Sequence, residues 1–354
     1  MSRPRIGLAG VGTLGARHAQ ALAGLAAAED APLSFSGVFD LRAERAEAAA
    51  RAHGTTAFMT YEALLADCDG VVVATPTVAH RAAALTALAA GKGVFVEKPI
   101  AESLESARAI VQAAQGRPLF VGHSERFNPA VRAAKDVASR PRYIEARRLA
   151  GFSPRATDVD VVLDLMIHDI DLVLALTGER PARVHAIGVA VLTESEDLAN
   201  AWLEFPSGTV AALTASRVSP ERLRKLRVFS DHAYLSLDLL AGKAEAAFAD
   251  HVRLAEAARA YAHHAAHAAG AVAAPPAALP DWTDLLERRT LVAPEPSAQP
   301  LVLELEAFAR AVATGTAAPS GRFDLATGEQ GLAALEVAED VRRALRERAA
   351  RWPS

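Results

Sequence analysis

The chain has 354 residues, of which 51% are hydrophobic and 23% are charged, and its formal net charge is -4. This length suits two domains, and this composition can bury a core, which excludes a globally disordered chain. The acidic balance argues against nucleic acid as the main partner, because phosphate binding needs a basic surface. The single cysteine, Cys68, excludes an internal disulfide bond. With neither a signal-like start nor an apolar run of about 20 residues, the sequence predicts a cytoplasmic protein without membrane insertion.

The first third of the chain alternates short β-rich runs with Ala-rich helical stretches. Alternation of this kind is typical of a parallel sheet with helices on both faces. We therefore expect residues 1–122 to form an α/β domain. The expected strands are 6–9, 33–39, 70–74, 94–96 and 119–121, and the expected helices are 16–28, 41–53, 80–90 and 103–114.

After Gly122 the pattern changes. Beyond one strong helix at 161–176, strand-like runs follow one another without intervening helices, which predicts an α+β domain over 123–354 with an open, mostly antiparallel sheet. Such a sheet leaves one face to cover, so we expect a homodimer or homotetramer formed through it. The expected strands are 142–149, 183–192, 199–205, 209–216, 226–230 and 233–239.

Residues 241–298 are Ala- and His-rich and then Pro-rich, which predicts a loop or a mobile polar helix. Two helices, 301–313 and 327–348, close the chain, and we expect them to pack back on the first domain. The histidines of the Ala-rich stretch have no nearby cysteine and no apolar scaffold, so we expect no metal site there. They are His263, His264 and His267.

A glycine-rich turn lies between the first expected strand and the first expected helix. Gly10 permits the tight bend, Gly12 lets the backbone approach a diphosphate, and Gly15 lets helix and strand pack closely. The helix N-terminus then faces the negative charge. The sequence therefore predicts a dinucleotide-binding (Rossmann) turn that includes Thr13 and Leu14, although a chance Gly-rich loop is the alternative.

Polar residues at the ends of the next strands complete the expected cofactor site. Asp40 ends the second strand, where an acid binds the ribose hydroxyls and repels a 2′-phosphate, which favours NAD over NADP. Arg42 could accommodate that phosphate instead, and Asp40 could also cap a helix. Thr75 and Pro76, with His80 one turn into the next helix, are expected along the cleft. An ordinary helix residue is the alternative for His80.

Lys98 follows an apolar strand and precedes a proline that fixes the turn, in the motif Glu97-Lys98-Pro99. Its amine should project into the cleft, where it could hydrogen-bond the reacting oxygen or lose a proton if its pKa is depressed. A solvated surface lysine is the alternative. We count Glu97 and Lys98 with the cofactor site.

Asp164 and His168 are four residues apart in a strongly apolar helix, so they share a face. His168 can take a hydroxyl proton while hydride leaves carbon, and Asp164 can orient substrate or support Lys98. A buried structural hydrogen bond is the alternative. Asp169 and Asp171 are interpreted as the polar flank of this helix.

A polar segment that begins at His123 follows the last strand of the first domain and should lie over the cleft. Within it, Arg126 and Asn128 could bind a phosphate or sugar hydroxyls. Arg148 ends a strand near the same edge. We count these four residues with His168 as candidate substrate-binding residues, and a solvated rim is the alternative for the arginines.

With these motifs in view, the chain resembles the family of glucose–fructose oxidoreductase, inositol dehydrogenase and rhizopine-catabolism oxidoreductases (Gfo/Idh/MocA). The ordered combination of the glycine turn, the Glu97-Lys98-Pro99 motif, Asp164 with His168 and the later strand meander carries the resemblance. It implies a dinucleotide-binding domain, a C-terminal sheet domain and a site between them. It also implies that Lys98, Asp164 and His168 serve catalysis, with the histidine or the lysine as the acid–base.

Two longer strings, 123–130 and 164–171, resemble the branch that oxidises UDP-N-acetylglucosamine at the 3-hydroxyl for a diamino-sugar lipid A. Many relatives carry a glycine run just before the aspartate, where this chain has Asp158-Val159-Asp160. Our hypothesis is therefore NAD-dependent oxidation of a secondary sugar alcohol, with that sugar nucleotide as the first candidate substrate. The alternatives are a dehydrogenase of a free sugar or inositol, and a nicotinamide-responsive regulatory protein without turnover.

Overall fold

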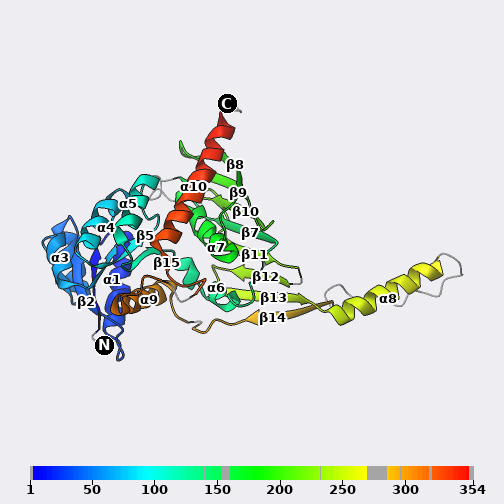
Figure 1. Ribbon diagram of the computed structural model, residues 1–354, viewed down its shortest axis with the longest axis horizontal. Coiled ribbons are helices and arrows are strands. Elements are labelled where there is room, and N and C mark those ends of the chain that lie inside the picture. Colours follow the sequence, from blue (N-terminus) through cyan, green and yellow to red (C-terminus); the bar gives the residue numbers. More distant parts are fainter. Residues whose placement is uncertain are drawn as a thin grey trace.

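The computed structural model describes residues 3–138, 140–152, 160–231, 233–268, 285–295, 297–318 and 321–350. Its first sheet has seven strands in the order β15-β6-β5-β4-β1-β2-β3, and β1 to β6 run parallel (Figure 1). This order confirms the predicted doubly wound α/β arrangement, whose cleft lies where the strand order reverses, between β1 and β4. The strands are β1 (Arg5–Ala9), β2 (Ser34–Phe39), β3 (Thr56–Ala57), β4 (Gly70–Val73), β5 (Gly93–Glu97), β6 (Leu119–Gly122) and β15 (Ala326–Thr327).

Helices cover this sheet. The central strands β4 and β5 are buried along their whole length, which is why their sequences are unbroken apolar runs. Strand β3 and helix α3 were not predicted, since a strand of 2 residues and a helix of 7 residues leave little periodic signal. The helices are α1 (Thr13–Ala26), α2 (Ala43–His53), α3 (Tyr61–Asp67), α4 (His80–Ala89) and α5 (Leu104–Ala114).

The second sheet has eight strands in the order β14-β13-β12-β11-β7-β10-β9-β8. Only β7 and β10 pair in parallel, so the predicted open, mostly antiparallel sheet is confirmed. The strands are β7 (Tyr143–Leu149), β8 (Arg183–Val189), β9 (Leu198–Glu204), β10 (Val210–Ser216), β11 (Leu223–Phe229), β12 (Ala233–Asp238), β13 (Lys243–Ala249) and β14 (Leu286–Leu291).

One face of this sheet is buried and the other is open. In β9, Ala199, Ala201 and Leu203 are fully buried, whereas Trp202 between them is 41% exposed. The buried face packs against the predicted helix, which the structure divides into a π-helical turn, η4 (Val162–Met166), and α7 (Ile167–Thr177). The elements before it are η2 (Ser124–Phe127) and α6 (Pro129–Ala134).

The described residues of 241–298 differ in part from the expected loop or mobile polar helix, because two strands form there besides a helix. Strands β13 and β14 extend the second sheet, and α8 (His251–Ala268) follows β13 and stands out from the body of the molecule (Figure 1). Strand β13 is alanine-rich and β14 is charged at half of its positions, so neither carries a run of β-branched and aromatic residues that indicates a strand from sequence. Pairing of β13 with β12, and of β14 with β13, decided their conformation.

The last two helices close the chain as predicted. Phe308 of α9 (Pro300–Thr314) packs on Phe95 of β5 and Phe120 of β6. Strand β15 pairs with β6, and α10 (Gly328–Ala349) follows it and also packs on α7 and β8. The end of the chain therefore connects the two sheets and fixes the β6 edge beside α7.

Candidate active site

The amine of Lys98 lies just beyond β5 and reaches the second domain. Its Nζ donates a hydrogen bond of 2.8 Å to the backbone oxygen of Asp164 and lies 3.8 Å from the Oδ1 atom of the same residue. Burial lowers the pKa of Lys98, a shift that Asp164 opposes and the cation of Arg148 increases. With its side chain only 17% exposed, Lys98 is not a solvated surface lysine.

His168 lies in the first turn of α7, four residues after Asp164. The side chain is half-buried, and its Nδ1 atom is buried without a hydrogen-bond partner among the described residues. Burial holds the pKa of His168 well below 6.5, and the cations of Lys98 and Arg148 act in the same direction. The imidazole is therefore neutral at about pH 7 and can accept a proton.

The carboxylate of Asp160 explains where the helix that carries Asp164 and His168 begins. Its Oδ1 accepts hydrogen bonds from the backbone amides of Val162 and Leu163, at 3.0 and 3.1 Å. Its Oδ2 accepts one of 2.7 Å from Nε of Arg342 on α10. Asp160 thus caps η4, while Asp158 and Val159 lie outside the described residues.

The glycines between β1 and α1 pack as the sequence predicts. Gly10 has φ +89°, and a Cβ there would lie 2.8 Å from the backbone of Ala74 and Thr75. A Cβ on Gly15 would lie 2.0 Å from the carbonyl oxygen of Gly10. Each position therefore requires glycine, because any larger residue would move the backbone at the switch point of the sheet.

Gly12, by contrast, faces open space. A Cβ there would meet nothing within 4 Å, and as the residue before α1 it supplies no side-chain cap. The first-turn amides, including those of Thr13 and Leu14, consequently have no side-chain acceptor at the helix N-terminus. Open space beside uncapped amides fits a diphosphate, so these residues suit the diphosphate of NAD.

Asp40 connects β2 to the glycine turn. Its Oδ2 accepts a hydrogen bond of 2.8 Å from the amide of Val11, and its Oδ1 accepts one of 2.9 Å from the amide of Arg42. Arg42 precedes α2, so Asp40 is not the residue that begins this helix. The carboxylate remains half-buried at the carboxyl end of β2, and the Arg42 side chain is exposed.

Thr75 and Pro76 follow β4 beside Gly10, as expected, but His80 does not face the cleft. The His80 ring is buried, with Nδ1 at 3.0 Å from the carbonyl oxygen of Pro99 and Nε2 at 3.0 Å from that of Thr75. The expectation that His80 binds the cofactor is therefore corrected. Its ring connects the segment after β4 to the segment after β5.

Glu97 likewise forms its side-chain contact within the fold. Its Oε1 lies 2.6 Å from Nε2 of His18 on α1, and both side chains are buried. Burial alone would raise the pKa of Glu97, but the hydrogen bond with His18 lowers it below the usual range. Glu97 therefore holds α1 against β5, which corrects its assignment as a direct cofactor ligand.

Arg126 and Asn128 are buried and fully engaged. Arg126 donates to Asp171 on α7 through Nε at 2.8 Å and Nη2 at 2.6 Å, and to Gln330 through Nη1 at 2.9 Å. Asn128 caps α6 and donates to Glu125 and to the backbone oxygen of Leu239, just after β12. We therefore correct their predicted role in substrate binding, because buried polar groups here serve packing that sequence alone cannot reveal.

Arg148 is engaged in the same way. It binds Asp169 through Nε at 3.0 Å and Nη2 at 2.7 Å, and Glu125 through Nη1 at 2.8 Å. His123 is 1% exposed and its Nδ1 lies 3.8 Å from Asp171. Neither residue is placed to bind a large substrate directly, so both expectations are corrected. Asp169, interpreted from sequence as polar flank, instead positions the helix that carries His168.

One residue near His168 was missed at the level of sequence. Arg224 on β11 contributes to the low pKa of His168, and its side chain is 36% exposed. The expected strand began at Leu226, which left Arg224 in a loop. The mixture of charged and apolar residues that runs from Arg222 through Val228, with Leu226 and Val228 at alternate positions, was the available signal for a strand that starts at Leu223.

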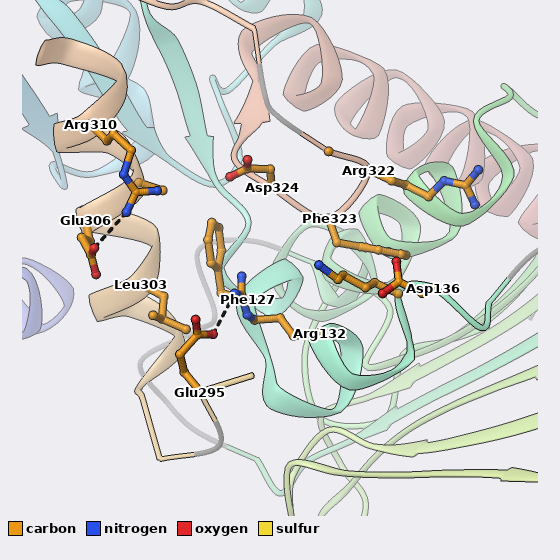
Figure 2. A pocket seen from close by; sticks show the side chains of 13 residues that line it. Phe127, Arg132, Asp136, Glu295, Leu303, Glu306, Arg310, Arg322, Phe323 and Asp324 are labelled. Carbon is orange, nitrogen blue, oxygen red and sulfur yellow. Dashed lines mark hydrogen bonds and ion pairs between the residues drawn. The ribbon is translucent and has the colours of Figure 1, made fainter. Parts of the chain in front are cut away.

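A separate cavity of about 400 Å³ lies between α6, α9 and residues 321–324 (Figure 2). Its charges pair locally, with Arg132 bound to Glu295 and Arg310 to Glu306, each at 2.8 Å. None of Lys98, Asp164 and His168 lines it. The cavity is therefore distinct from the predicted site.

The described part of the chain contains no group of three or more His, Cys, Asp or Glu side chains placed to hold a metal ion. Among the same residues, no helix is long and apolar enough to cross a bilayer. The side chains of His263, His264 and His267 lie outside the described residues.

Comparison with known proteins assigns both parts of the chain. Residues 4–123 match the model of the oxidoreductase family with an NAD-binding Rossmann fold, and residues 136–236 match the GFO/IDH/MocA C-terminal domain. The UDP-N-acetylglucosamine 3-dehydrogenase of Acidithiobacillus ferrooxidans is 44% identical over 243 residues, which cover 68% of this chain and 75% of that protein. The inositol 2-dehydrogenase of Rhizobium meliloti is 33% identical over 233 residues, or 60% and 68% of the two chains.

A solved structure of the Acidithiobacillus enzyme has a similar fold along nearly the whole length of this chain. It aligns with a TM-score of 0.80 and 34% identity, covering 98% of this chain and 99% of that one. The chain therefore belongs to the GFO/IDH/MocA family of NAD-binding oxidoreductases.

Proposed function

We propose that the protein oxidises the 3-hydroxyl of UDP-N-acetylglucosamine with NAD. The observation that supports this chemistry is the contact of Lys98 with Asp164, which lies one helical turn before the neutral imidazole of His168. The identity of 44% to a UDP-N-acetylglucosamine 3-dehydrogenase supports the choice of substrate.

The proposed mechanism assigns one task to each of the three residues. His168 accepts the hydroxyl proton, because its neutral imidazole is the base that burial and nearby cations have made available. Lys98 donates a hydrogen bond to the same oxygen and stabilises the charge that develops on it. Asp164 holds the Lys98 amine in place. When bound, NAD would supply the acceptor for the hydride that leaves carbon 3.

Gly12, Thr13 and Leu14 would hold the diphosphate of NAD, and Asp40 its adenosine ribose. The Asp40 carboxylate also disfavours a 2′-phosphate. Gly10 permits the tight bend of this turn, and Gly15 permits the close packing of α1 on it. Thr75 and Pro76 would line the cleft toward the nicotinamide.

The test is reduction of NAD by purified protein supplied with UDP-N-acetylglucosamine. We expect formation of NADH and of the 3-keto sugar nucleotide, and loss of turnover in Lys98→Met and His168→Asn. Turnover of free N-acetylglucosamine or of an inositol, with none of the sugar nucleotide, would overturn the substrate. Full biological activity in a His168→Asn variant without turnover would favour the regulatory alternative.

We also propose that the chain works as two units, residues 1–122 and 123–354, and as a homo-oligomer through the open face of the second sheet. The packing of Phe308 on β5 and β6 supports the return of the last helices to the first unit. The exposed side chains of Trp202, Ile187 and Val189 support a second copy as the occupant of the open face. Light scattering tests this, since Trp202→Glu should yield monomers.

A further inference from the structure

Two arginines lie at and just before the start of β11, beside the proposed active site. Leu226 and Val228 of β11 are buried against the core, so Arg224, two residues before Leu226, projects from the same face. The exposed Arg222 directly precedes the strand. In the pairing of β11 with β7, Arg224 lies directly opposite Arg148. Cβ atoms of such partners are about 5 Å apart, so two guanidinium groups extend side by side.

The two opposed arginines are not equally neutralised. Arg148 binds both oxygens of Asp169 and takes the Oε1 atom of Glu125 at 2.8 Å. Arg224 shares that same Oε1 atom, through Nη1, at the longer distance of 3.3 Å. The other Glu125 oxygen accepts from Asn128. Among the residues that the structure describes, Arg224 therefore has one weak, shared acceptor and unused donors.

Arg222 adds a second cation at the same place. Among the described residues its guanidinium forms no ion pair, and its side chain is exposed. Burial and the neighbouring cations Arg148 and Arg222 lower the pKa of Arg224, whereas Glu125 opposes this. Like charges gathered with too few carboxylates favour a bound anion.

The position of this pair identifies which anion it faces. Arg224 lies opposite Arg148, whose guanidinium binds Asp169, the residue next to His168. The amides suited to NAD lie instead at the start of α1. We propose that Arg224 and Arg222 bind the diphosphate of the sugar-nucleotide substrate and so place its sugar at His168. This inference rests on the proposed function. Planar guanidinium groups suit it because each can bind two phosphoryl oxygens at once.

Binding of UDP to the NAD-loaded protein, measured by calorimetry, tests the proposal directly. We compare wild type with Arg224→Met, and with Arg222→Met because the exposed Arg222 can be replaced without disturbing the core. Arg227→Met is the matched control, since Arg227 lies on the same strand and forms an ion pair with Glu145 on the other face.

We expect Arg224→Met to weaken UDP binding by about 10- to 100-fold, as the loss of charge-assisted hydrogen bonds implies, and Arg222→Met by a smaller factor. The Kd for NAD should not change in either variant. Arg224→Lys should restore part of the affinity. In turnover, KM for the sugar nucleotide should rise far more than kcat falls.

Two results separate this inference from the proposed function. If the wild type turns over UDP-N-acetylglucosamine and both arginine variants keep UDP affinity and KM within twofold of wild type, the inference is wrong and the function stands. If the wild type binds UDP through Arg224 but does not oxidise that sugar nucleotide, the assigned substrate is wrong and the anion site stands. Absence of UDP binding to the wild type would overturn both.

Discussion

Replacing Arg126 by methionine should destabilise the fold rather than weaken substrate binding. Arg126 and Asp171 are each 1% exposed and joined by two hydrogen bonds of 2.6 and 2.8 Å. Asp171 would lose its guanidinium partner in Arg126→Met, and among the described residues only His123 would remain nearby, at 3.8 Å. Removing one partner of a buried ion pair costs about 3–5 kcal/mol. The free energy of unfolding should fall by that amount.

Urea titration followed by circular dichroism measures this loss. Arg132→Met is the control, because its ion pair with Glu295 is 22% and 48% exposed and should contribute less than about 1 kcal/mol (Figure 2). The double variant Arg126→Met with Asp171→Leu should recover much of the stability, since no buried charge remains. A stable Arg126→Met protein whose KM for the sugar nucleotide rises tenfold would refute the assignment of Arg126 to the fold.

Three other predictions follow from the same contacts. Gly12→Ala should change the free energy of unfolding by less than about 1 kcal/mol yet bind NAD poorly, because its methyl group fills only the open space. Gly15→Ala should lose both stability and NAD binding, since its Cβ would meet the Gly10 carbonyl oxygen. Equal stability of the two variants in thermal unfolding would contradict this. On the acid side, kcat/KM should fall as pH drops through the pKa of His168. Because burial lowers that pKa, an acid limb centred above 6.5 in a pH–rate profile would contradict burial of the ring. Burial raises the pKa of Glu304 well above 4.5, so the stability of the wild type should fall as pH rises from 4.5 toward that pKa. Glu304→Gln should remove this loss. Urea titrations at about pH 5 and pH 8 in which both proteins change equally would argue against the prediction.

The sequence predicted what depends on period and on glycine geometry. Gly10, Asp40 and Lys98 each follow an apolar strand, which placed them at the carboxyl edge of a parallel sheet. The strand order and the close packing of Gly15 on Gly10 agree with that prediction. The helical spacing of Asp164 and His168 also placed both on the helix that meets Lys98.

What the sequence could not show is which polar groups are buried. Arg126 and Arg148 lie in segments that do reach the site, but each folds inward onto a carboxylate three residues or fewer from His168. Partners so distant in sequence are chosen by tertiary packing. Arg224 was missed for the related reason that its strand begins with charged residues, and its significance depends on the register with β7.

The most direct test of the account follows deuterium from carbon 3 of UDP-N-acetylglucosamine. Lys98, Asp164 and His168 are proposed to support transfer of that hydrogen to bound NAD. Mass spectrometry of the nicotinamide should find one deuterium in the reduced cofactor from wild-type protein and none from His168→Asn. Reduced cofactor without deuterium, or equal labelling by the His168→Asn variant, would contradict the proposed chemistry.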